Sequence, residues 1–319
     1  MTERLSLAVP SKGRLEEQVN ALFAAADVPL QRDGSRGYRG QLKGLLEVDL
    51  IYLSASEIAT RLGEGAIHLG VTGEDLIREE IPDVESRVVL LQELGFGHAN
   101  VVVAIPDAWI DVTHMADLAE VAGDFRQRHG HRLRVATKYI QLTQDFFATH
   151  GITDYTIVQS FGATEGAPSS GAAEAIVDIT STGATLKAND LRIPEDGVIL
   201  KSQANLAASL KADWSAAARA AAKHILAQVS AMQAGEQMME LKFTSPVPPE
   251  QLIEAESAVI QSAVPSGNGF ACTMVVARAQ FTALRDRLGQ RNIAVIADTP
   301  KFIFGPDNNR AFERLSGAL

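Results

Sequence analysis

A short apolar run near the middle of the chain ends in an acidic residue and opens onto a turn of small, hydroxyl-bearing residues. The run is 175–179, with Asp178 near its end, and the turn comprises Ser181, Thr182, Gly183, Ala184 and Thr185. Backbone N–H groups point outward at such a strand-to-helix turn, and glycine lets the backbone approach a ligand closely. Because each hydrogen bond to a charged group contributes about 1.5–3 kcal/mol, several donors together can hold an anion. The turn therefore predicts a phosphate cradle.

Two carboxylates near the turn indicate which kind of phosphate it binds. Asp178 lies just before the turn, where it would repel a bare phosphate unless it binds hydroxyl groups or a metal ion. Glu165, across the preceding turn, can reach the same hydroxyl groups. A sugar phosphate therefore fits better than inorganic phosphate. The spacing also allows a second interpretation, in which Thr182 is an ordinary helix N-cap and Asp178 a solvated strand end.

The elements that must position the turn alternate along the first 210 residues. Apolar β-rich runs predict strands at 5–9, 45–53, 67–71, 88–91, 100–105, 133–136, 155–158, 175–179 and 198–201. Helical spacing of apolar residues predicts helices at 16–26, 58–62 and 74–80. Strands that alternate with helices are typical of an α/β architecture with largely parallel sheets, and the length favours two lobes.

The pattern changes after residue 204. Residues 205–236 are rich in alanine and predict one long helix that ends near Gly235 and connects to the next unit. Strands are then expected at 239–244, 259–264, 270–277 and 293–296, and helices at 249–257 and 280–289. The order β-α-β-β-α-β predicts a small ferredoxin-like domain.

Composition excludes several classes of protein. The chain has 319 residues, 46% hydrophobic and 21% charged, which is typical of a globular protein with two or three domains. Its formal net charge of −10 argues against sequence-independent binding of nucleic acid. The N-terminus lacks the apolar stretch of a signal peptide, and no run reaches the roughly 18 apolar residues of a membrane span. We therefore expect a cytoplasmic protein without nucleic-acid or membrane partners, in which the single Cys272 is buried.

The segment 165–186 resembles the signature of the ATP phosphoribosyltransferase family. The residues that match this signature in register are Glu165, Gly171, Ala173, Ile176, Asp178, Ile179, Thr182, Gly183, Thr185 and Leu186. Segments 8–15, 62–77, 94–104 and 134–152 resemble other parts of the family in order and spacing. The resemblance covers about residues 5–205, whereas the residues of the C-terminal part match only weakly.

The resemblance implies a fold and a domain organisation. The expected fold is α/β, with a two-lobed catalytic core like a periplasmic binding protein and a C-terminal ferredoxin-like (βαββαβ) domain. Residues 1–95 and 181–210 would form lobe I, and 96–180 lobe II with the phosphoribosyl pyrophosphate loop. Residues 211–235 would be the connecting helix and 236–319 a regulatory-type domain, as in the long form of the family.

The resemblance also implies a reaction and site residues. The family joins adenine N1 of ATP to C1 of phosphoribosyl pyrophosphate with Mg²⁺ and releases pyrophosphate, as the first step of L-histidine biosynthesis. The loop residues named above would bind the 5-phosphate, with Asp178 and Glu165 at the ribose hydroxyls. Lys12 and Arg14 are candidates for the nucleotide or pyrophosphate side. No metal-ligand set is assigned to the chain itself.

Two further groups are weaker candidates. Thr72, Gly73 and Glu74 would line the cleft or play only structural roles. Gly95, Phe96 and Gly97 suit a tight turn at the lobe hinge as well as a ligand contact.

A basic segment, 31–44, has two interpretations. It carries Arg32, Arg36, Arg39 and Lys43 among four glycines. Such a cationic loop can close over a triphosphate, or it can be a solvated hairpin. Residues 1–44 hold seven basic and five acidic side chains, so the acidity of the chain belongs to its later part.

Other functions and partners remain open at the level of sequence. A non-catalytic two-lobed binding or sensor protein is the main alternative to the enzyme. Inhibition by L-histidine and a homo-oligomer, a dimer or a hexamer, are implied by the domain order of the long form. Residues 258–274, however, lack the Ser-Pro-Thr stretch expected in the usual version of that form.

Overall fold

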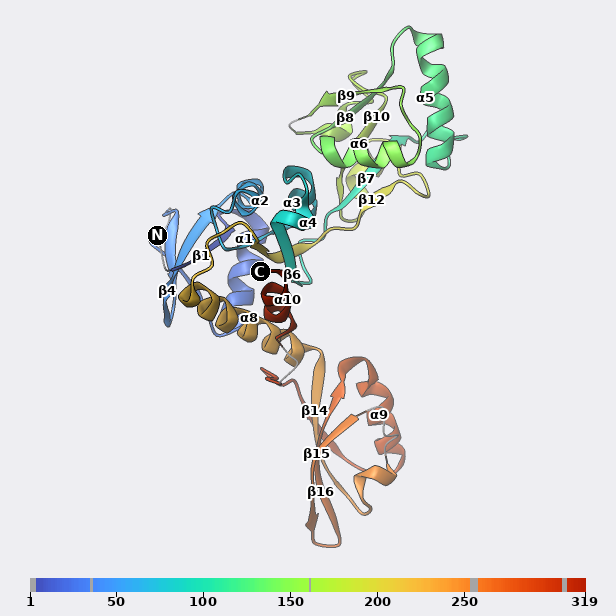
Figure 1. Ribbon diagram of the computed structural model, residues 1–319. Helices are drawn as coiled ribbons and strands as arrows, with labels where there is room; N and C mark the ends of the chain where they lie inside the picture. The colour runs from blue at the N-terminus through green and yellow to red at the C-terminus, as the bar shows by residue number, and fades with distance from the viewer. Residues whose placement is uncertain (1–3, 35–36, 161, 253–257, 306–308) are drawn as a thin grey trace.

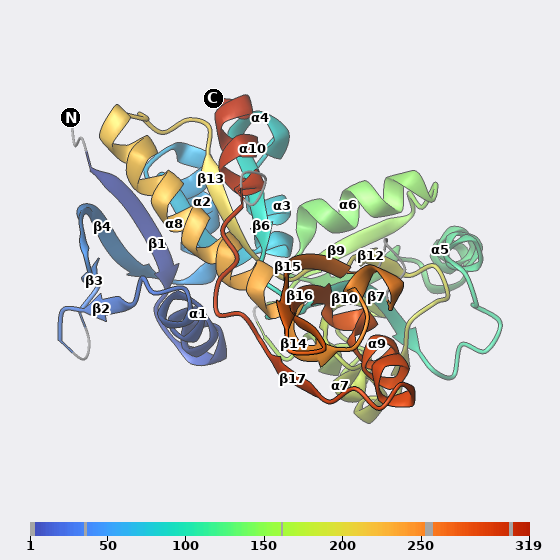
Figure 2. The same ribbon diagram turned by 90° about the horizontal axis from the view of Figure 1, so that it is seen from below.

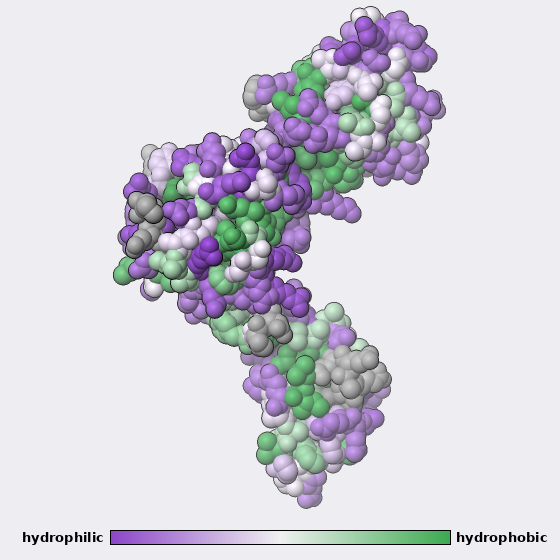
Figure 3. Space-filling model, viewed as in Figure 1, coloured by the Kyte–Doolittle hydropathy of each residue, from purple (hydrophilic) through white to green (hydrophobic). Residues whose placement is uncertain are grey.

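The computed structural model describes residues 4–34, 37–160, 162–252, 258–305 and 309–319. Two α/β lobes lie next to each other, and a smaller sheet extends from the end of the long helix α8 (Ala216–Glu236), as Figure 1 shows. The face seen in Figure 3 is largely hydrophilic, with hydrophobic side chains gathered near the junction of the lobes. Within the described residues, no helix is long and apolar enough to cross a membrane.

The first lobe is built on a seven-stranded sheet with the order β2-β3-β4-β1-β5-β13-β6. Its strands are β1 (Leu5–Pro10), β2 (Leu30–Arg32), β3 (Arg39–Leu42), β4 (Leu45–Leu53), β5 (Leu69–Gly73), β6 (Val88–Glu93) and β13 (Ala204–Ser209). Its helices are α1 (Gly13–Ala25), α2 (Ala55–Glu64), α3 (Glu74–Glu80) and α4 (Val84–Arg87). Because β1 is parallel to β4 and β5, helices α1, α2 and α3 all begin at one edge of the sheet.

The second lobe is built on a sheet with the order β11-β7-β10-β8-β9, in which β12 also pairs with β7. Its strands are β7 (Asn100–Pro106), β8 (Leu133–Thr137), β9 (Tyr155–Gln159), β10 (Ala175–Thr180), β11 (Leu191–Arg192) and β12 (Val198–Leu200). Its helices are α5 (Met115–His129), α6 (Ile140–Thr149) and α7 (Ala184–Ala188). Strand β10 is parallel to β8 and antiparallel to β7, as the predicted α/β architecture allows.

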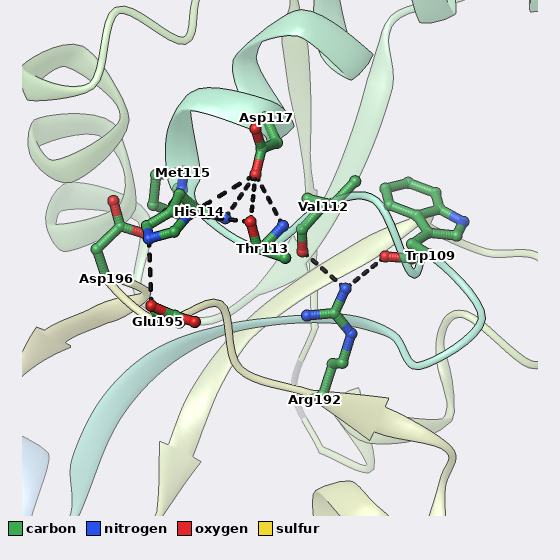
Figure 4. A network of polar contacts seen from close by, with 9 residues as sticks. All are labelled: Trp109, Val112, Thr113, His114, Met115, Asp117, Arg192, Glu195 and Asp196. Atoms are coloured by element: carbon green, nitrogen blue, oxygen red, sulfur yellow. Dashed lines mark hydrogen bonds and ion pairs between the residues drawn. The ribbon is translucent and has the colours of Figure 1, made fainter.

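The sheet pairing corrects one predicted boundary. Residues 181–210 were expected in the first lobe, but β11 and β12 both pair with β7 in the second. Arg192 on β11 donates to the carbonyls of Trp109 and Val112, and the backbone N–H of Met115 donates to Asp196 Oδ1 at 2.7 Å (Figure 4). These bonds hold the segment against the start of α5, so only β13 returns to the first sheet.

The start of α5 also provides a pH-dependent contribution to stability. Asp117 accepts hydrogen bonds from the backbone N–H of His114 at 2.8 Å and from the Thr113 hydroxyl at 2.9 Å (Figure 4). These two bonds lower the pKa of Asp117 below its ordinary value of 3.8. A depressed pKa in the folded state means that the stabilisation is present at neutral pH and is lost as the pH falls through that pKa.

We therefore expect Asp117→Asn to lower the Tm at neutral pH, and we expect the difference from the unsubstituted chain to shrink below about pH 4. Thermal unfolding followed by circular dichroism at several pH values measures this. Glu120→Gln, an exposed carboxylate on the same helix, is the control and should leave the Tm unchanged. A Tm difference for Asp117→Asn that is constant with pH would contradict the argument.

The predicted long helix at 205–236 is wrong in its first part. Residues Ala204–Ser209 form strand β13, which is buried along its whole length between β5 and β6. Helix α8 begins only at Ala216, where the hydroxyl of Ser215 caps it by accepting the Ala218 N–H at 3.0 Å. Alanine favours a helix locally, but here pairing on both sides of the strand outweighs that preference.

The C-terminal sheet has the strand order β15-β16-β14-β17 with antiparallel neighbours throughout, which confirms the predicted ferredoxin-like arrangement. Its elements are β14 (Met238–Ser245), β15 (Ala258–Ser266), β16 (Gly269–Ala277), α9 (Arg278–Gln290) and β17 (Val295–Asp298). Cys272 is buried in its core, as expected. Of the predicted helix at 249–257, the turn η2 (Pro249–Gln251) is present, and residues 253–257 lie outside the described part.

The chain does not end in this sheet, contrary to the prediction of one domain over 236–319. Helix α10 (Arg310–Ala318) packs against α8 and β6, and its Ala311 and Leu315 are buried in the core of the first lobe (Figure 2). On the way there, the backbone N–H of Ile303 donates to the carbonyl of Ala231 in α8 at 2.9 Å. The last helix is therefore a structural part of the first lobe, because its apolar side chains complete that core.

Candidate active site

The turn for which the sequence predicts a phosphate cradle lies at the carboxyl end of β10. Gly183 adopts φ +75°, and its backbone N–H donates to the Thr180 hydroxyl at 2.8 Å. The turn lines a hollow of about 260 Å³, and the side chains of Thr182 and Thr185 are exposed beside it. Since α7 is barely more than one turn long, an anion at this turn would depend on hydroxyl and backbone donors rather than on a helix dipole.

The roles of Thr182 and Ser181 in the turn differ from those expected from the sequence. The N-cap position of α7 is Gly183, so Thr182 is not its N-cap residue. The hydroxyl of Ser181 donates to the carbonyl of His98 at 2.8 Å, so this hydroxyl anchors the turn instead of pointing to a ligand. The loop thus leaves Thr182 and Thr185 as its exposed hydroxyls that donate to no other described residue.

The two predicted carboxylates lie beside this turn. Asp178 is half-buried on β10, where one of its oxygens accepts the backbone N–H of Ile179 at 2.8 Å. Glu165 is half-buried on the short turn η1 (Thr164–Gly166), which packs against β10. Neither carboxylate forms an ion pair with a described residue, so both are available to hydroxyl groups of a ligand.

Lys12 and Arg14 stand at the start of α1 in the first lobe. Both are exposed, and neither has a hydrogen-bond or ion-pair partner among the described residues. They lie at the carboxyl edge of the parallel strands, where Pro10 of β1 is in register with Leu53 of β4. This is the edge at which ligands bind in open α/β sheets.

Two antiparallel chain segments connect the lobes and bring the two halves of the site together. The backbone N–H groups of Leu94 and Ala99 donate to the carbonyls of Ala204 and Ser202, both at 3.0 Å. We call residues 94–99 and 202–204 the crossing segments. They bound the region in which the first lobe, the second lobe and the cradle meet.

Gly97 shows why the crossing segments are close to both halves. It has φ +66°, and a Cβ there would lie 3.2 Å from Leu15 in the first turn of α1 and from Ala204. The next residue, His98, accepts the hydrogen bond from Ser181 of the cradle. The crossing segment therefore touches the first turn of α1 in the first lobe and the cradle of the second. Glycine suits position 97 because the backbone has a positive φ there and a Cβ would be crowded.

The candidates Thr72, Gly73 and Glu74 are engaged inside the first lobe. Thr72 is fully buried and its hydroxyl donates to the carbonyl of Ala55 at 2.8 Å, so it does not line a cleft. Glu74 forms an ion pair with Arg78 at 2.7 Å. A Cβ on Gly73 would lie only 2.2 Å from an Asp75 oxygen, so this glycine makes room for that carboxylate.

The structure adds residues that sequence reasoning missed. Asp75 is buried and accepts hydrogen bonds at 2.8 Å from the hydroxyls of Tyr139 and Ser202. Lys138 is exposed directly after β8, the parallel neighbour of β10, with its ammonium 4.9 Å from the ring centre of Tyr139. The signal that could have found Lys138 and Tyr139 is their place after a parallel strand next to the cradle strand.

The basic segment at 31–44 is less available to a ligand than its charge indicates. Arg32 pairs with Glu16 at 2.9 Å, donates to the carbonyl of Gly37 at 2.6 Å, and lies 4.3 Å from the ring centre of Tyr52. Arg39 and Lys43 are exposed, whereas Arg36 lies outside the described residues. Strands β2 and β3 form the sheet edge opposite β6 (Figure 2), and the Arg32 guanidinium also donates to the carbonyl of Ser11, beside Lys12, at 3.3 Å.

This arrangement predicts different effects for two arginines. Arg32→Ala should lower the free energy of unfolding by about 2 kcal/mol, because it removes a charged hydrogen bond and a cation–aromatic contact together. Arg39→Ala should change it by less than about 0.5 kcal/mol, as is usual for an exposed side chain. Urea unfolding measures both values. Arg39→Ala should also leave the KM for ATP unchanged, and a clear rise in that KM would restore the triphosphate-loop hypothesis.

Fold and site together define a class: a two-lobed α/β protein with a hydroxyl-rich strand-to-helix turn beside the segments that cross between its lobes. The profile described as "HisG: ATP phosphoribosyltransferase" matches residues 54–231. The chain is 58% identical over 247 residues to the ATP phosphoribosyltransferase of Nitrobacter winogradskyi, which covers 77% of this chain and 76% of that protein. It is 58% identical over 243 residues to the enzyme of the same name from Bradyrhizobium sp., covering 76% and 75%. The chain belongs to the ATP phosphoribosyltransferase family.

Among solved structures, the chain is similar to the "ATP phosphoribosyl transferase (HisG:HisZ) complex from Thermotoga maritima". That likeness has a TM-score of 0.49 at 25% identity and covers 64% of this chain and 87% of the other. Family membership confirms the resemblance seen in the signature segment and makes the chain a transferase of histidine biosynthesis. The alternative of a non-catalytic binding or sensor protein is not favoured.

Proposed function

We propose that this chain joins N1 of the adenine of ATP to C1 of phosphoribosyl pyrophosphate, with the cradle of the second lobe and the basic turn of the first as the two halves of its site. The observation that carries this proposal is the cradle beside Asp178, next to the crossing segments. The lone pair of N1 forms the new bond to C1. The bond from C1 to pyrophosphate breaks, and its electron pair leaves with the pyrophosphate.

This reaction needs no side chain as the nucleophile, because adenine N1 already carries a lone pair. The protein must instead orient two polyanions and stabilise the charges that develop. Thr182 and Thr185, with the backbone N–H groups of the turn, would bind the 5-phosphate. Asp178 and Glu165 would accept hydrogen bonds from the ribose hydroxyls.

The positive side chains around the crossing segments would serve the phosphates that the cradle does not hold. Lys12 and Arg14 approach from the first lobe, and Lys138 follows β8 in the second. All three are exposed and can therefore reach a polyphosphate. Their placement in both lobes suits a reaction in which ATP and a pyrophosphate group must be held at the same time.

A magnesium ion fits this set of residues when it arrives with the substrate. Mg²⁺ is usually bound by one or two carboxylates together with substrate phosphates and water. The described residues include no group of three or more His, Cys, Asp or Glu side chains arranged to hold a metal, but Asp178 and Glu165 can each supply a carboxylate. When bound, the ion would neutralise charge on the departing pyrophosphate.

Pyrophosphate release tests the proposed reaction. The purified chain is mixed with ATP, phosphoribosyl pyrophosphate and Mg²⁺, and pyrophosphate is measured with a coupled assay. Release should require both substrates. Omission of either substrate is the control, and circular dichroism confirms that the protein is folded. Absence of release by the folded chain would reject the transferase and favour the binding-protein alternative.

We further propose a cytoplasmic homo-oligomer, a dimer or a hexamer, whose C-terminal sheet binds L-histidine as an inhibitor. The sheet is joined to the first lobe through α8 and through the returning helix α10, so a change in it can reach the catalytic lobes. Equilibrium dialysis with L-histidine should use the whole chain, because a fragment starting at 236 would lose the core into which α10 packs. No binding to the whole chain would reject the inhibitor. Light scattering after size exclusion determines the oligomeric state.

A further inference from the structure

Helix α3 of the first lobe makes the main side-chain contact with the second lobe. Three residues carry this contact: Asp75, Leu76 and Glu79. Leu76 packs against the hydrophobic cores of both lobes. The two carboxylates stand one helical turn apart and both bind groups at the start of α6. One face of a short helix is thus devoted to the other lobe.

Asp75 joins three parts of the chain that are far apart in sequence. One oxygen accepts the Tyr139 hydroxyl and the other accepts the Ser202 hydroxyl, each at 2.8 Å. The backbone N–H of Asp75 in turn donates to Ser202 Oγ at 3.0 Å. All three residues are buried, with exposed fractions of 5%, 1% and 2%. Because buried polar groups without partners are costly, this set of bonds tolerates only one relative placement of its members.

Glu79 provides a second, independent bond between the lobes. Its two carboxylate oxygens accept the backbone N–H groups of Gln141 at 3.0 Å and Leu142 at 3.1 Å. These N–H groups belong to the first turn of α6, which has no partner for them within the helix. Burial raises the pKa of Glu79, and the two N–H groups act in the opposite direction. A residue of the first lobe therefore caps a helix of the second.

The contact lies next to the cradle strand. Tyr139 follows β8, which is parallel to β10 with Thr137 in register with Val177. Burial and the charge of Asp75 raise the pKa of Tyr139, and the charge of Asp178 acts in the same direction. The phenol therefore stays protonated and lies within electrostatic reach of a carboxylate from each lobe. The Tyr139 ring therefore connects Asp75 of the first lobe with the strand that neighbours β10, the strand of Asp178.

We propose that Asp75, Glu79, Tyr139 and Ser202, here called the interlobe latch, are positioning residues for the transfer reaction. The latch fixes the angle between the lobes, so that the basic turn carrying Lys12 and Arg14 faces the cradle carrying Asp178. This inference rests on the proposed function, because it concerns the alignment of the two substrates. It assigns the latch no contact with either substrate.

The latch should affect the rate more than the binding of phosphoribosyl pyrophosphate. Phosphoribosyl pyrophosphate binds to the cradle within one lobe, whereas bond formation needs both lobes aligned. A misplacement of about 1 Å can cost about 100-fold in rate. Tyr139→Phe should therefore lower kcat at least about tenfold and change the Kd for phosphoribosyl pyrophosphate by less than about threefold. Tyr155→Phe, a half-buried tyrosine of the same lobe whose hydroxyl forms no bond to described residues, is the matched control.

Glu79 offers a rescue test. Glu79→Gln keeps an oxygen that can accept an N–H group of α6, whereas Glu79→Ala removes every acceptor. We expect kcat to fall in Glu79→Ala and to be largely restored in Glu79→Gln. Equal losses in both variants would overturn the capping role. A kcat of Tyr139→Phe within about twofold of the unsubstituted chain would overturn the latch.

A distance measurement separates the latch from the reaction itself. Glu64→Cys in the first lobe and Glu120→Cys in the second place spin labels at exposed positions, while the native Cys272 is buried. Pulsed dipolar spectroscopy on labelled chain diluted with unlabelled chain should give one narrow distance, and Tyr139→Phe should broaden it. If pyrophosphate is never released but the distance broadens, the proposed function fails, and the latch is shown only to fix the angle between the lobes. An unchanged narrow distance in Tyr139→Phe overturns the latch, whatever the activity.

Discussion

Asp178→Asn is expected to lower kcat/KM for phosphoribosyl pyrophosphate by about 100-fold, because a charged hydrogen bond to a ribose hydroxyl contributes about 1.5–3 kcal/mol. The carboxylate is half-buried at the end of β10 and has no ion pair among the described residues. Its full charge is therefore available to the ligand and to the positive charge that develops at C1. Steady-state pyrophosphate release at varied phosphoribosyl pyrophosphate and saturating ATP gives the ratio.

The control for this prediction is Asp190→Asn. Asp190 is an exposed carboxylate just past α7, and its φ of +54° is one that asparagine tolerates well. The substitution Asp190→Asn should leave kcat/KM and the Tm unchanged. If Asp178→Asn cost less than about threefold, the carboxylate would be a solvated strand end, as the alternative interpretation of the sequence holds.

The double substitution Thr182→Ala/Thr185→Ala is expected to raise the KM for phosphoribosyl pyrophosphate by about 100-fold with a small change in kcat. In the proposed site each hydroxyl would donate to a phosphate charge, at about 1.5–3 kcal/mol per bond, while the backbone donors of the turn remain. Removal of binding that is equal in the ground and transition states raises KM without lowering kcat. The KM for ATP should change much less.

Serine at both positions is the matched control, because it keeps the hydroxyls and removes only the methyl groups. Thr182→Ser/Thr185→Ser should stay within about threefold of the original KM. If the double alanine variant raised the KM for ATP instead, the cradle would hold the triphosphate, and the roles of the two half-sites would have to be exchanged.

The cradle could be predicted from sequence because the interactions that shape it are local. Gly183 donates to Thr180 within the same turn, and the apolar run before it forms a strand in any α/β sheet. The strand order of the C-terminal sheet could be expected for a similar reason, since element order and hairpin connections restrict the possible topologies. The composition and signature of the chain therefore led to the fold class and to the family.

Other features depend on pairings that no local pattern encodes. Residues 204–209 became a strand only because β5 and β6 flank them, although alanine favours a helix. The last helix returned to the first lobe because Ala311 and Leu315 complete its core. Arg32 has the charge of a ligand-binding residue, but its guanidinium forms an ion pair with Glu16 and lies over the ring of Tyr52.

The types and local spacing of residues were sufficient to predict the hydroxyl-rich turn after β10, its acidic neighbours and the α/β lobes. The tertiary structure alone revealed the bond between Asp75 and Tyr139, which are 64 residues apart. It also showed that Thr72 is enclosed inside the first lobe, while the side chains of Lys12 and Arg14 are exposed at the sheet edge without partners among the described residues. The reason is physical: local geometry follows from short-range hydrogen bonds, whereas burial and partnership depend on which distant segments exclude water together.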